Sequence, residues 1–259
     1  MTTDLAVNPA ALFRLDGRVA IVTGASAGLG ERFARVLHSA GAHVVLAARR
    51  LDRLEVLARE LPGSLAVACD VADEAQRVDL VAQTVARFGR IDILVNNAGI
   101  TQVVGIENEE IDFFRRAMEV NVTAVWHLCK LVGPHMMATG SGSVINVASM
   151  LGIVGGTPVK QANYCASKGA VVNMTRELAL QWGRKGIRVN ALCPGWFPSE
   201  MTAPMDGDEA SQRFVRQNAA IPRMGESQEL DGPLLLLASD AGGYMTGHAL
   251  VVDGGWTAH

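Results

Sequence analysis

Short apolar runs recur along the chain, and longer amphipathic stretches lie between them. The runs are nearly continuous in apolar and β-branched residues instead of alternating with polar ones, which is typical of strands covered on both faces. They predict strands at residues 19–23, 43–47, 65–69, 91–95, 144–148, 188–193 and 249–252. The amphipathic stretches predict helices at residues 31–39, 52–60, 73–88, 113–137, 164–182 and 229–239.

This alternation of strands and helices predicts an α/β fold built from βαβ units. With right-handed crossovers, such units form a Rossmann-type doubly wound parallel sheet of about seven strands, with helices on both faces. No internal repeat or linker divides the chain, so we expect a single Rossmann-type domain over residues 1–259, with an N-terminal extension over residues 1–14. Residues 194–223 are less regular and rich in Pro, Gly and Met. Long irregular loops in compact domains are usually functional, so this segment is a predicted substrate lid.

The composition excludes several functions. Apolar residues make up 49% of the 259 residues, too many for a disordered chain, and 23 basic against 26 acidic side chains leave a net charge of −3. A strongly electrostatic nucleic-acid binder is therefore excluded. The chain has no signal peptide and no apolar run of about 18 residues, so we expect a cytoplasmic protein that does not enter membranes. The four cysteines are Cys69, Cys129, Cys165 and Cys193. They lack C-x-x-C spacing, which fits a reducing compartment and the absence of a metal site.

The first predicted strand leads directly into a glycine-rich turn and then a helix. Gly24, Gly28 and Gly30 form a G-x-x-x-G-x-G pattern, without the Gly-Lys-Ser/Thr of a Walker A motif. Backbone N–H groups and the positive helix end in such a turn can face a phosphate, and glycine lets the pyrophosphate of a dinucleotide approach closely. A tight turn with a purely structural role is the alternative. Ser26 also completes a G-x-S-x-G pattern, but only one strand precedes it, which disfavours a hydrolase nucleophile.

The end of the second predicted strand bears on the choice of cofactor. An acidic residue there would bind a ribose 2′-hydroxyl, whereas an arginine would accommodate a 2′-phosphate. The chain has Ala48 followed by Arg49, and its next carboxylate is Asp52. A guanidinium grips a phosphate that a carboxylate would repel, so the sequence favours NADP(H) and leaves NAD(H) open. Alternatively, Arg49 and Arg50 simply begin a solvated helix.

A tyrosine and a lysine share one face of the predicted helix over residues 164–182. Tyr164 and Lys168 are at positions i and i+4, so the ends of their side chains can approach each other. Tyrosine, with a pKa of about 10, is a poor acid–base catalyst at neutral pH, but a nearby ammonium favours the phenolate and lowers that pKa. The pair could then exchange a proton with a carbonyl or alcohol oxygen. An ordinary surface pair on a helix is the alternative.

Further polar residues follow the predicted strands in a fixed order. Asn-Asn-Ala-Gly at residues 96–99, then Asn121 and Ser149, lie between the glycine-rich turn and the tyrosine–lysine pair. Together with that turn and that pair, they closely resemble the short-chain dehydrogenase/reductase family over residues 15–257. The resemblance implies an oxidoreductase that transfers a hydride between a nicotinamide cofactor and a small-molecule ketone or secondary alcohol. It also implies a homotetramer.

The resemblance assigns a role to each matching residue. Tyr164 exchanges the proton, Ser149 binds the same substrate oxygen, and Asn121 joins Lys168 to solvent through a water. The expected cofactor-binding residues include an adenine-contacting pair and a nicotinamide-side loop. They are Gly24, Ser26, Gly28, Leu29, Gly30, Arg49, Asp70, Val71, Asn97, Ala98, Gly99, Tyr164, Lys168, Pro194, Gly195, Phe197 and Ser199.

One interval departs from the family pattern. Ser149 precedes Tyr164 by 15 residues, a longer interval than is usual in the family, and the extra length falls in residues 155–160. We expect this stretch to reshape the substrate entrance.

The predicted substrate-pocket residues are apolar. Leu151, Trp196 and Met201 suit a ketone or secondary alcohol with a hydrophobic or alicyclic body, unless they form a small core of the lid itself. The sequence therefore favours an NADP(H)-dependent carbonyl reductase. The alternatives are an NAD-dependent alcohol, polyol or sugar-acid dehydrogenase, a 3-oxoacyl-carrier-protein reductase, and a non-catalytic cofactor-binding sensor or scaffold.

Overall fold

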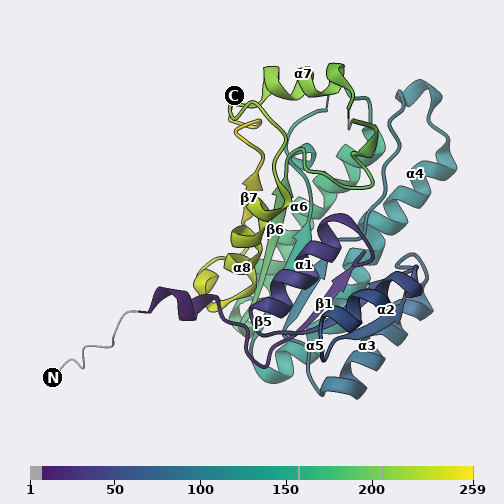
Figure 1. Ribbon diagram of the computed structural model, residues 1–259. Helices are drawn as coiled ribbons and strands as arrows, with labels where there is room; N and C mark the ends of the chain where they lie inside the picture. Colours follow the sequence, from purple (N-terminus) through teal and green to yellow (C-terminus); the bar gives the residue numbers. More distant parts are fainter. Residues whose placement is uncertain (1–7, 157, 206, 259) are drawn as a thin grey trace.

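Within the described residues, 8–156, 158–205 and 207–258, the computed structural model has seven parallel strands in one sheet between two layers of helices (Figure 1). The strands are β1 (Val19–Thr23), β2 (His43–Ala48), β3 (Leu65–Ala68), β4 (Ile93–Asn96), β5 (Gly142–Val147), β6 (Ile187–Pro194) and β7 (Ala249–Val252). Their order across the sheet is β3-β2-β1-β4-β5-β6-β7, and every neighbouring pair is parallel. The predicted doubly wound Rossmann-type sheet is confirmed.

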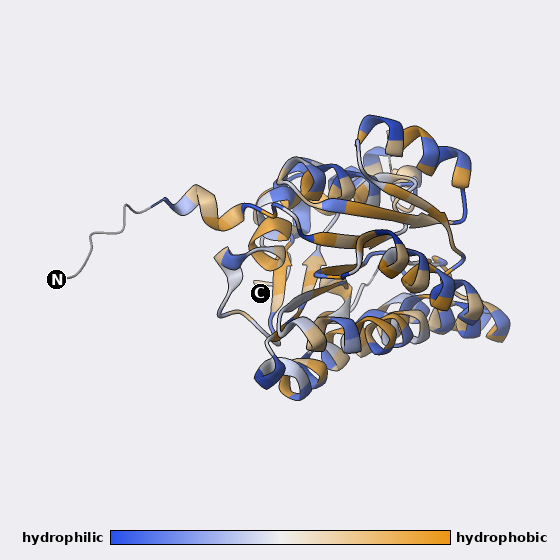
Figure 2. Ribbon diagram, turned by 90° about the horizontal axis from the view of Figure 1, so that it is seen from below, coloured by the Kyte–Doolittle hydropathy of each residue, from blue (hydrophilic) through white to orange (hydrophobic). Residues whose placement is uncertain are grey.

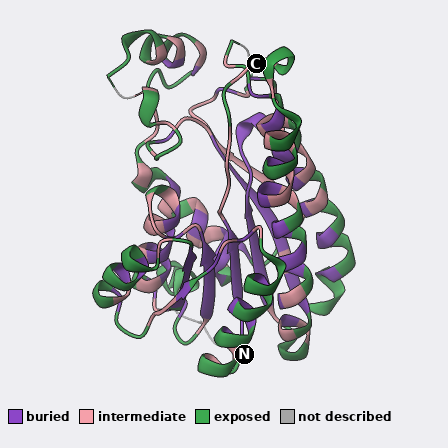
Figure 3. Cartoon of the chain, turned by 90° about the vertical axis from the view of Figure 1, so that its right-hand side faces the viewer, coloured by how far each residue is buried: buried purple, intermediate pink, exposed green. Residues whose placement is uncertain are grey.

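Helices cover both faces of this sheet. The α-helices of the described part are α1 (Gly28–Ser39), α2 (Leu51–Glu60), α3 (Glu74–Phe88), α4 (Ile111–Met118), α5 (Ala124–Thr139), α6 (Ala162–Trp182), α7 (Glu209–Asn218) and α8 (Asp231–Ala238). Alternate side chains of a strand point to opposite faces, so in β1 Val19 and Ile21 join one core while Ala20 and Val22 join the other. Helices α3, α5 and α6 pack on the first face, and α1, α2 and α8 on the second. Burial on both faces explains why the central strands are continuous apolar runs (Figures 2 and 3).

The direction in which the chain winds changes between β1 and β4, which are neighbours in the sheet. From β1 the chain continues outward to β2 and β3, then crosses back to β4 and continues in the other direction to β7. Ligands of doubly wound sheets bind outside the carboxyl ends of the strands at such a switch point. The glycine-rich turn directly follows β1, and residues 97–99 directly follow β4, so both lie at this point.

The helix predicted over residues 113–137 is interrupted. α4 ends at Met118, a π-helical turn covers Glu119–Thr123, and α5 begins at Ala124. Single π-helical turns are frequent at functional sites, and this one contains Asn121. The apolar periodicity continues through the turn, which is why the sequence predicted one uninterrupted helix.

The 194–223 segment contains a helix that the sequence did not predict. In α7, the Asp208 side chain caps the N-terminus by accepting a hydrogen bond from the Ser211 N–H at 2.8 Å. Val215 is the only buried residue among the ten of α7, so the helix carries too sparse an apolar pattern to be recognised. The expectation of irregular structure is therefore wrong for Glu209–Asn218.

The N-terminal extension predicted over residues 1–14 is described from residue 8 onward, and residues 1–7 lie outside the described part. Pro9–Phe13 form a 3-10 helix without a buried residue. Among the residues that the structure describes, no helix is long and apolar enough to cross a lipid bilayer.

Candidate active site

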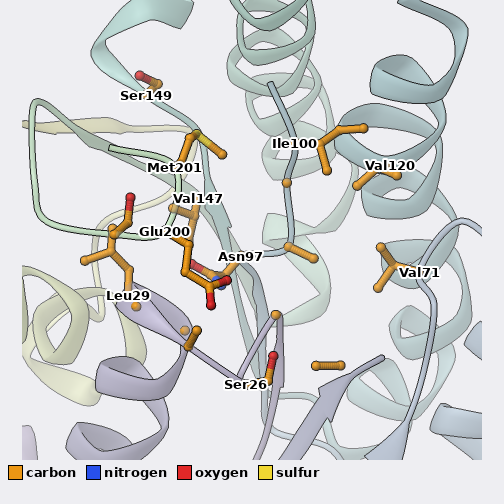
Figure 4. A pocket seen from close by; sticks show the side chains of 18 of the residues that line it. Ser26, Leu29, Val71, Asn97, Ile100, Val120, Val147, Ser149, Glu200 and Met201 are labelled. Carbon is orange, nitrogen blue, oxygen red and sulfur yellow. The ribbon is translucent and has the colours of Figure 1, made fainter. Parts of the chain in front are cut away.

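A cleft lies at the switch point, outside the carboxyl ends of the strands (Figure 4). Every residue predicted from the sequence to bind the cofactor lines this cleft, together with Ser149 and Met201. The structure therefore brings the glycine-rich turn, the end of β2 and the tyrosine–lysine pair to one cavity. Across the described part of the chain, no group of three or more His, Cys, Asp or Glu side chains is arranged to hold a metal ion.

Hydrogen bonds hold the glycine-rich turn against the loop that follows β4. The Thr23 hydroxyl accepts hydrogen bonds from the backbone N–H groups of Asn97 and Ala98, at 3.0 and 3.1 Å. The Asn97 side-chain amide donates to the Thr23 carbonyl at 2.9 Å. A Cβ added to Gly30 would lie 2.2 Å from the Gly24 carbonyl oxygen and 2.5 Å from Asn97 Nδ2. Glycine at this position is thus required for the turn to pack closely at the start of α1.

Replacing Gly30 by Ala is expected to weaken NADPH binding at least tenfold and to lower the thermal unfolding midpoint, because the backbone of the turn must move to admit the methyl group. Titration with NADPH and a thermal melt measure the two effects. The matched control is Gly232→Ala in α8, where an added Cβ meets nothing within 4 Å. Unchanged NADPH binding by Gly30→Ala would show that the geometry of the turn does not matter for the cofactor.

Charged side chains gather where β2 and β3 end. Arg49 and Arg50 directly follow β2, and both line the cleft. Asp70, which follows β3, accepts hydrogen bonds from Arg116 Nη2 and from the Ala72 N–H, at 2.9 and 3.0 Å. Burial opposes the ionisation of Asp70, but these two bonds outweigh it and hold the pKa of its carboxyl below the ordinary value. The guanidinium of Arg49, directly after β2, lies at the edge of the cleft where a ribose 2′-phosphate could be held.

Sequence reasoning missed three charged residues of the cleft: Arg50, which was weighed only as part of a solvated helix, Arg116 and Glu200. Arg116 pairs with Asp70 across 46 residues of sequence. Glu200 pairs with Arg50 across 150 residues. No sequence motif links the two members of either pair, so only the folded chain reveals these contacts.

One face of α6 presents Tyr164 and Lys168 to the cleft, next to Ser149 beyond the end of β5. The Lys168 side chain is buried, and its Nζ lies 5.4 Å from the centre of the Tyr164 ring. The same Nζ donates a hydrogen bond to the Val147 carbonyl at 2.7 Å. Ser149 Oγ accepts a hydrogen bond from the Leu151 N–H at 3.1 Å. The longer interval between Ser149 and Tyr164 therefore does not remove Ser149 from the cleft.

The ionisation of the tyrosine–lysine pair differs from the expectation. Burial raises the pKa of Tyr164 to about 12, although hydrogen bonding with Ser149 acts in the opposite direction. Burial also lowers the pKa of Lys168 to about 8. The expected lowering of the Tyr164 pKa is thus wrong for the protein by itself, because the loss of hydration outweighs the hydrogen bond with Ser149. At neutral pH, Tyr164 is an uncharged phenol that can donate a proton.

Asn121 lies behind the cleft and is fully buried. Its Oδ1 accepts a hydrogen bond from the Ile100 N–H at 2.8 Å. Its Nδ2 donates to the Ile100 carbonyl at 2.9 Å and to Ser167 Oγ at 3.0 Å. The π-helical turn therefore places the Asn121 side chain between the loop after β4 and α6. On α6 it contacts Ser167, the residue before Lys168.

Two of the three predicted substrate-pocket residues do not line the cleft. Leu151 and Trp196 belong to an apolar cluster with Phe214 and Trp256. The Trp196 ring makes edge-to-face contacts with both, at centroid distances of 6.4 Å to Phe214 and 5.9 Å to Trp256. The alternative that these residues form a small core of the 194–223 segment therefore describes Leu151 and Trp196. Met201 alone of the three reaches the cleft (Figure 4).

Known proteins share both the fold and much of the sequence. A family model described as enoyl-(acyl carrier protein) reductase matches residues 24–257. Galactitol 2-dehydrogenase (L-tagatose-forming) of Cereibacter sphaeroides is 38% identical over 250 residues, which cover 95% of this chain and 97% of that protein. A short-chain type dehydrogenase/reductase structure from Mycobacterium marinum has a TM-score of 0.92 and 36% identity, covering 97% of this chain and 100% of the other. The structure of a gluconate 5-dehydrogenase from Burkholderia cenocepacia J2315, solved with NADP and tartrate, also has a TM-score of 0.92 and 36% identity, covering 97% of this chain and 100% of the other.

The chain belongs to the short-chain dehydrogenase/reductase family. It is an oxidoreductase that transfers a hydride between a nicotinamide cofactor and a ketone or secondary alcohol.

Proposed function

We propose that this chain is an NADP(H)-dependent carbonyl reductase that acts on a neutral ketone and, in reverse, on the corresponding secondary alcohol. The observation that carries the proposal is the position of Arg49. It lines the cleft directly after β2, where a carboxylate would bind the 2′-hydroxyl of NAD(H). The presence of NADP in the similar gluconate 5-dehydrogenase supports the same cofactor.

The residues of the cleft fit a nicotinamide dinucleotide. Gly24 and Gly28 have φ angles of +68° and +56°, conformations that glycine adopts without strain and that turn the backbone into the start of α1. Pro194, Gly195 and Ser199 also line the cleft. When bound, the cofactor would supply or accept the hydride. The chain itself would hold the two reactants together and move one proton.

In the proposed reduction, Tyr164 donates the proton while Ser149 holds the substrate oxygen. Tyr164 is uncharged at neutral pH, so its phenol can hydrogen-bond to a carbonyl oxygen. Burial makes it a weaker acid, so release of the proton as that oxygen becomes negative depends on the positive charge of Lys168. Ser149 Oγ is a second donor that fixes the orientation of the same carbonyl. The ammonium of Lys168, 5.4 Å from the Tyr164 ring centre, would stabilise the phenolate that remains.

The proton lost by Tyr164 must be replaced, and we assign this relay to Lys168 and Asn121. Gly99 has no side chain to fill the space between them. A Cβ at Gly99 would lie 3.3 Å from Asn121 Oδ1 and 3.6 Å from Lys168 Nζ. A water that bridges Asn121 and Lys168 beside Gly99 could pass a proton from solvent to Lys168.

The reacting end of the cleft favours an apolar substrate. Ile100, Val147 and Met201 line the cleft together with Ser149 (Figure 4). Tyr164 lines the same cleft. These walls suit a ketone with a hydrophobic or alicyclic body, since burial of its apolar surface would contribute to binding. Dehydrogenation of a polyol is the second candidate, because galactitol 2-dehydrogenase is 38% identical to this chain.

We also propose that the protein is a cytoplasmic homotetramer. Its cysteines are free thiols in the structure, which fits a reducing compartment. Trp126 on α5 and Leu180 on α6 are 48% and 81% exposed. Large exposed apolar side chains on these helices would be buried in an assembly of identical subunits.

Replacing Arg49 by Ala is expected to raise the Kd for NADPH ten- to a hundredfold and to change that for NADH at most about twofold. A charge-assisted guanidinium–phosphate contact contributes roughly 1.5–3 kcal/mol, and NADH does not make this contact because it lacks the 2′-phosphate. Fluorescence titrations with both nucleotides measure the effect. Arg59→Ala, at the exposed end of α2, is the matched control. Equal weakening of NADPH and NADH would contradict a role for Arg49 in cofactor choice.

Steady-state turnover tests the proposed function as a whole. Neutral alkyl and alicyclic ketones, L-tagatose and 5-ketogluconate are each supplied with NADPH or NADH. The proposal predicts the highest kcat/KM for an alkyl or alicyclic ketone with NADPH. Faster turnover of L-tagatose, or of galactitol with NAD, would replace the proposal by the polyol alternative. Tight NADPH binding without turnover of any substrate would instead favour the non-catalytic sensor or scaffold.

A further inference from the structure

A carboxylate from the 194–223 segment binds two arginines at the start of α2. Glu200 Oε1 and Oε2 accept hydrogen bonds from Arg50 Nη1 and Nη2, at 2.8 and 2.9 Å. Arg53 Nη1 adds a third hydrogen bond to Glu200 Oε1 at 3.0 Å. A guanidinium uses the same two-pronged geometry for a phosphate as for a carboxylate. Figure 4 shows the Glu200 side chain directed into the cleft.

The same arginine is joined to the glycine-rich turn. Arg50 Nε and Nη2 donate to Ser26 Oγ, at 3.1 and 3.0 Å. Ser26 lies between Gly24 and the start of α1, where the phosphates of a dinucleotide would be bound. Arg49 precedes Arg50 in the chain and lines the same cleft. Glu200 therefore places a negative charge among the cationic groups that surround the proposed 2′-phosphate position.

We propose that Glu200 is a specificity-determining residue: its carboxylate occupies the Arg50–Arg53 pair, and the 2′-phosphate of NADP(H) must displace it. This inference rests on the proposed function, because it concerns how the 2′-phosphate gains its place. NAD(H), without that phosphate, leaves the ion pairs intact. Glu200 thus reduces the advantage that the arginines give to NADP(H), and its displacement releases the 194–223 segment from the start of α2.

The exposure of these groups favours displacement over a permanent clamp. The side chains of Glu200, Arg50 and Arg53 are 60%, 38% and 50% exposed. Exposed ion pairs contribute little to stability, because water screens them and the long side chains lose rotational freedom. A phosphate dianion carries more charge and more acceptor oxygens than a carboxylate, so it competes well for the same guanidinium groups.

Glu200→Gln tests the proposal, because it keeps the shape of the side chain and removes its charge. The probes are ADP-ribose and 2′-phospho-ADP-ribose, which lack the nicotinamide and differ only in the 2′-phosphate. Calorimetric titrations at fixed ionic strength give the ratio of the Kd for ADP-ribose to the Kd for 2′-phospho-ADP-ribose. The variant is expected to raise this ratio about three- to fivefold over the wild type, mainly through tighter binding of the 2′-phosphorylated probe.

A matched variant controls for the change in net charge. Glu60 is 50% exposed and pairs with Arg35 at 2.7 Å, outside the residues that line the cleft. Glu60→Gln removes the same charge and is expected to leave the ratio unchanged. An unchanged ratio in Glu200→Gln would overturn the proposal. Equal weakening of both probes would also overturn it, because Glu200 would then act as a clamp on any dinucleotide.

The wild-type ratio separates this inference from the proposed function. A wild-type ratio of one or less would contradict the preference for NADP(H), whatever the variant does. The proposal about Glu200 depends only on the change of the ratio between wild type and variant. A low wild-type ratio that rises in Glu200→Gln would therefore refute the cofactor preference and uphold the role of Glu200.

Discussion

Replacing Tyr164 by Phe is expected to lower kcat by a factor of about a thousand or more while leaving the Kd for NADPH within about twofold. The substitution removes the hydroxyl that would give its proton to the substrate oxygen, and general acid catalysis typically contributes factors of 10²–10⁴. Part of the loss is also due to substrate positioning, since the same hydroxyl would hold the carbonyl. Steady-state assays of ketone reduction measure kcat, and a nucleotide titration measures the Kd for NADPH.

The chain offers a matched control for this substitution. Its composition includes two tyrosines, and Tyr244 is fully exposed and lies outside the cleft. Tyr244→Phe is expected to leave both kcat and the Kd for NADPH unchanged. Substantial turnover by Tyr164→Phe would contradict the proposed mechanism, because no other phenol lines the described part of the cleft.

Replacing Lys168 by Met is expected to lower kcat at least a hundredfold and, at pH 7, to make the protein without cofactor more stable. The folded protein holds the pKa of Lys168 at about 8 instead of 10.5, because burial disfavours the ammonium. At 1.36 kcal/mol per unit, this burial costs on the order of 3 kcal/mol below pH 8. The hydrogen bond to Val147 returns about 1 kcal/mol, so the variant should unfold roughly 4–8 °C higher.

The pH dependence of stability checks the cause of this effect. Since the pKa of Lys168 is lowered in the folded state, the unfolded chain binds more protons between pH 8 and 10.5, and the wild type gains stability as the pH rises through this range. The advantage of Lys168→Met should therefore be largest below pH 8 and shrink toward pH 10.5. The exposed Lys185→Met is the control and should show no such trend. A constant difference between variant and wild type at all pH values would contradict burial as the cause.

The sheet could be predicted from the sequence because its central strands are covered on both faces. Continuous apolar runs such as β1 and β4 are typical of strands buried on both faces. The cleft could be predicted because backbone requirements and helix spacing leave traces in sequence. Gly30 packs where no side chain fits, and Tyr164 and Lys168 meet because they are one turn apart.

What the sequence could not supply depends on long-range contacts and on burial. The π-helical turn at Asn121 continues the apolar pattern of the helices on either side, so nothing local marks it. The raised pKa of Tyr164 follows from loss of hydration in the fold, which the spacing of two residues does not report. Trp196 was placed in the substrate pocket because it is apolar and near the cleft in sequence, but it packs on Phe214 and Trp256. No sequence pattern predicts the Glu200–Arg50 pair, whose members are 150 residues apart.

Direct titration of the protein with NADPH and with NADH, followed by quenching of tryptophan fluorescence, tests the central claim. The account predicts that NADPH binds at least tenfold more tightly than NADH, because Arg49 and its neighbours favour the 2′-phosphate. NADH binding that equals or exceeds NADPH binding would contradict it.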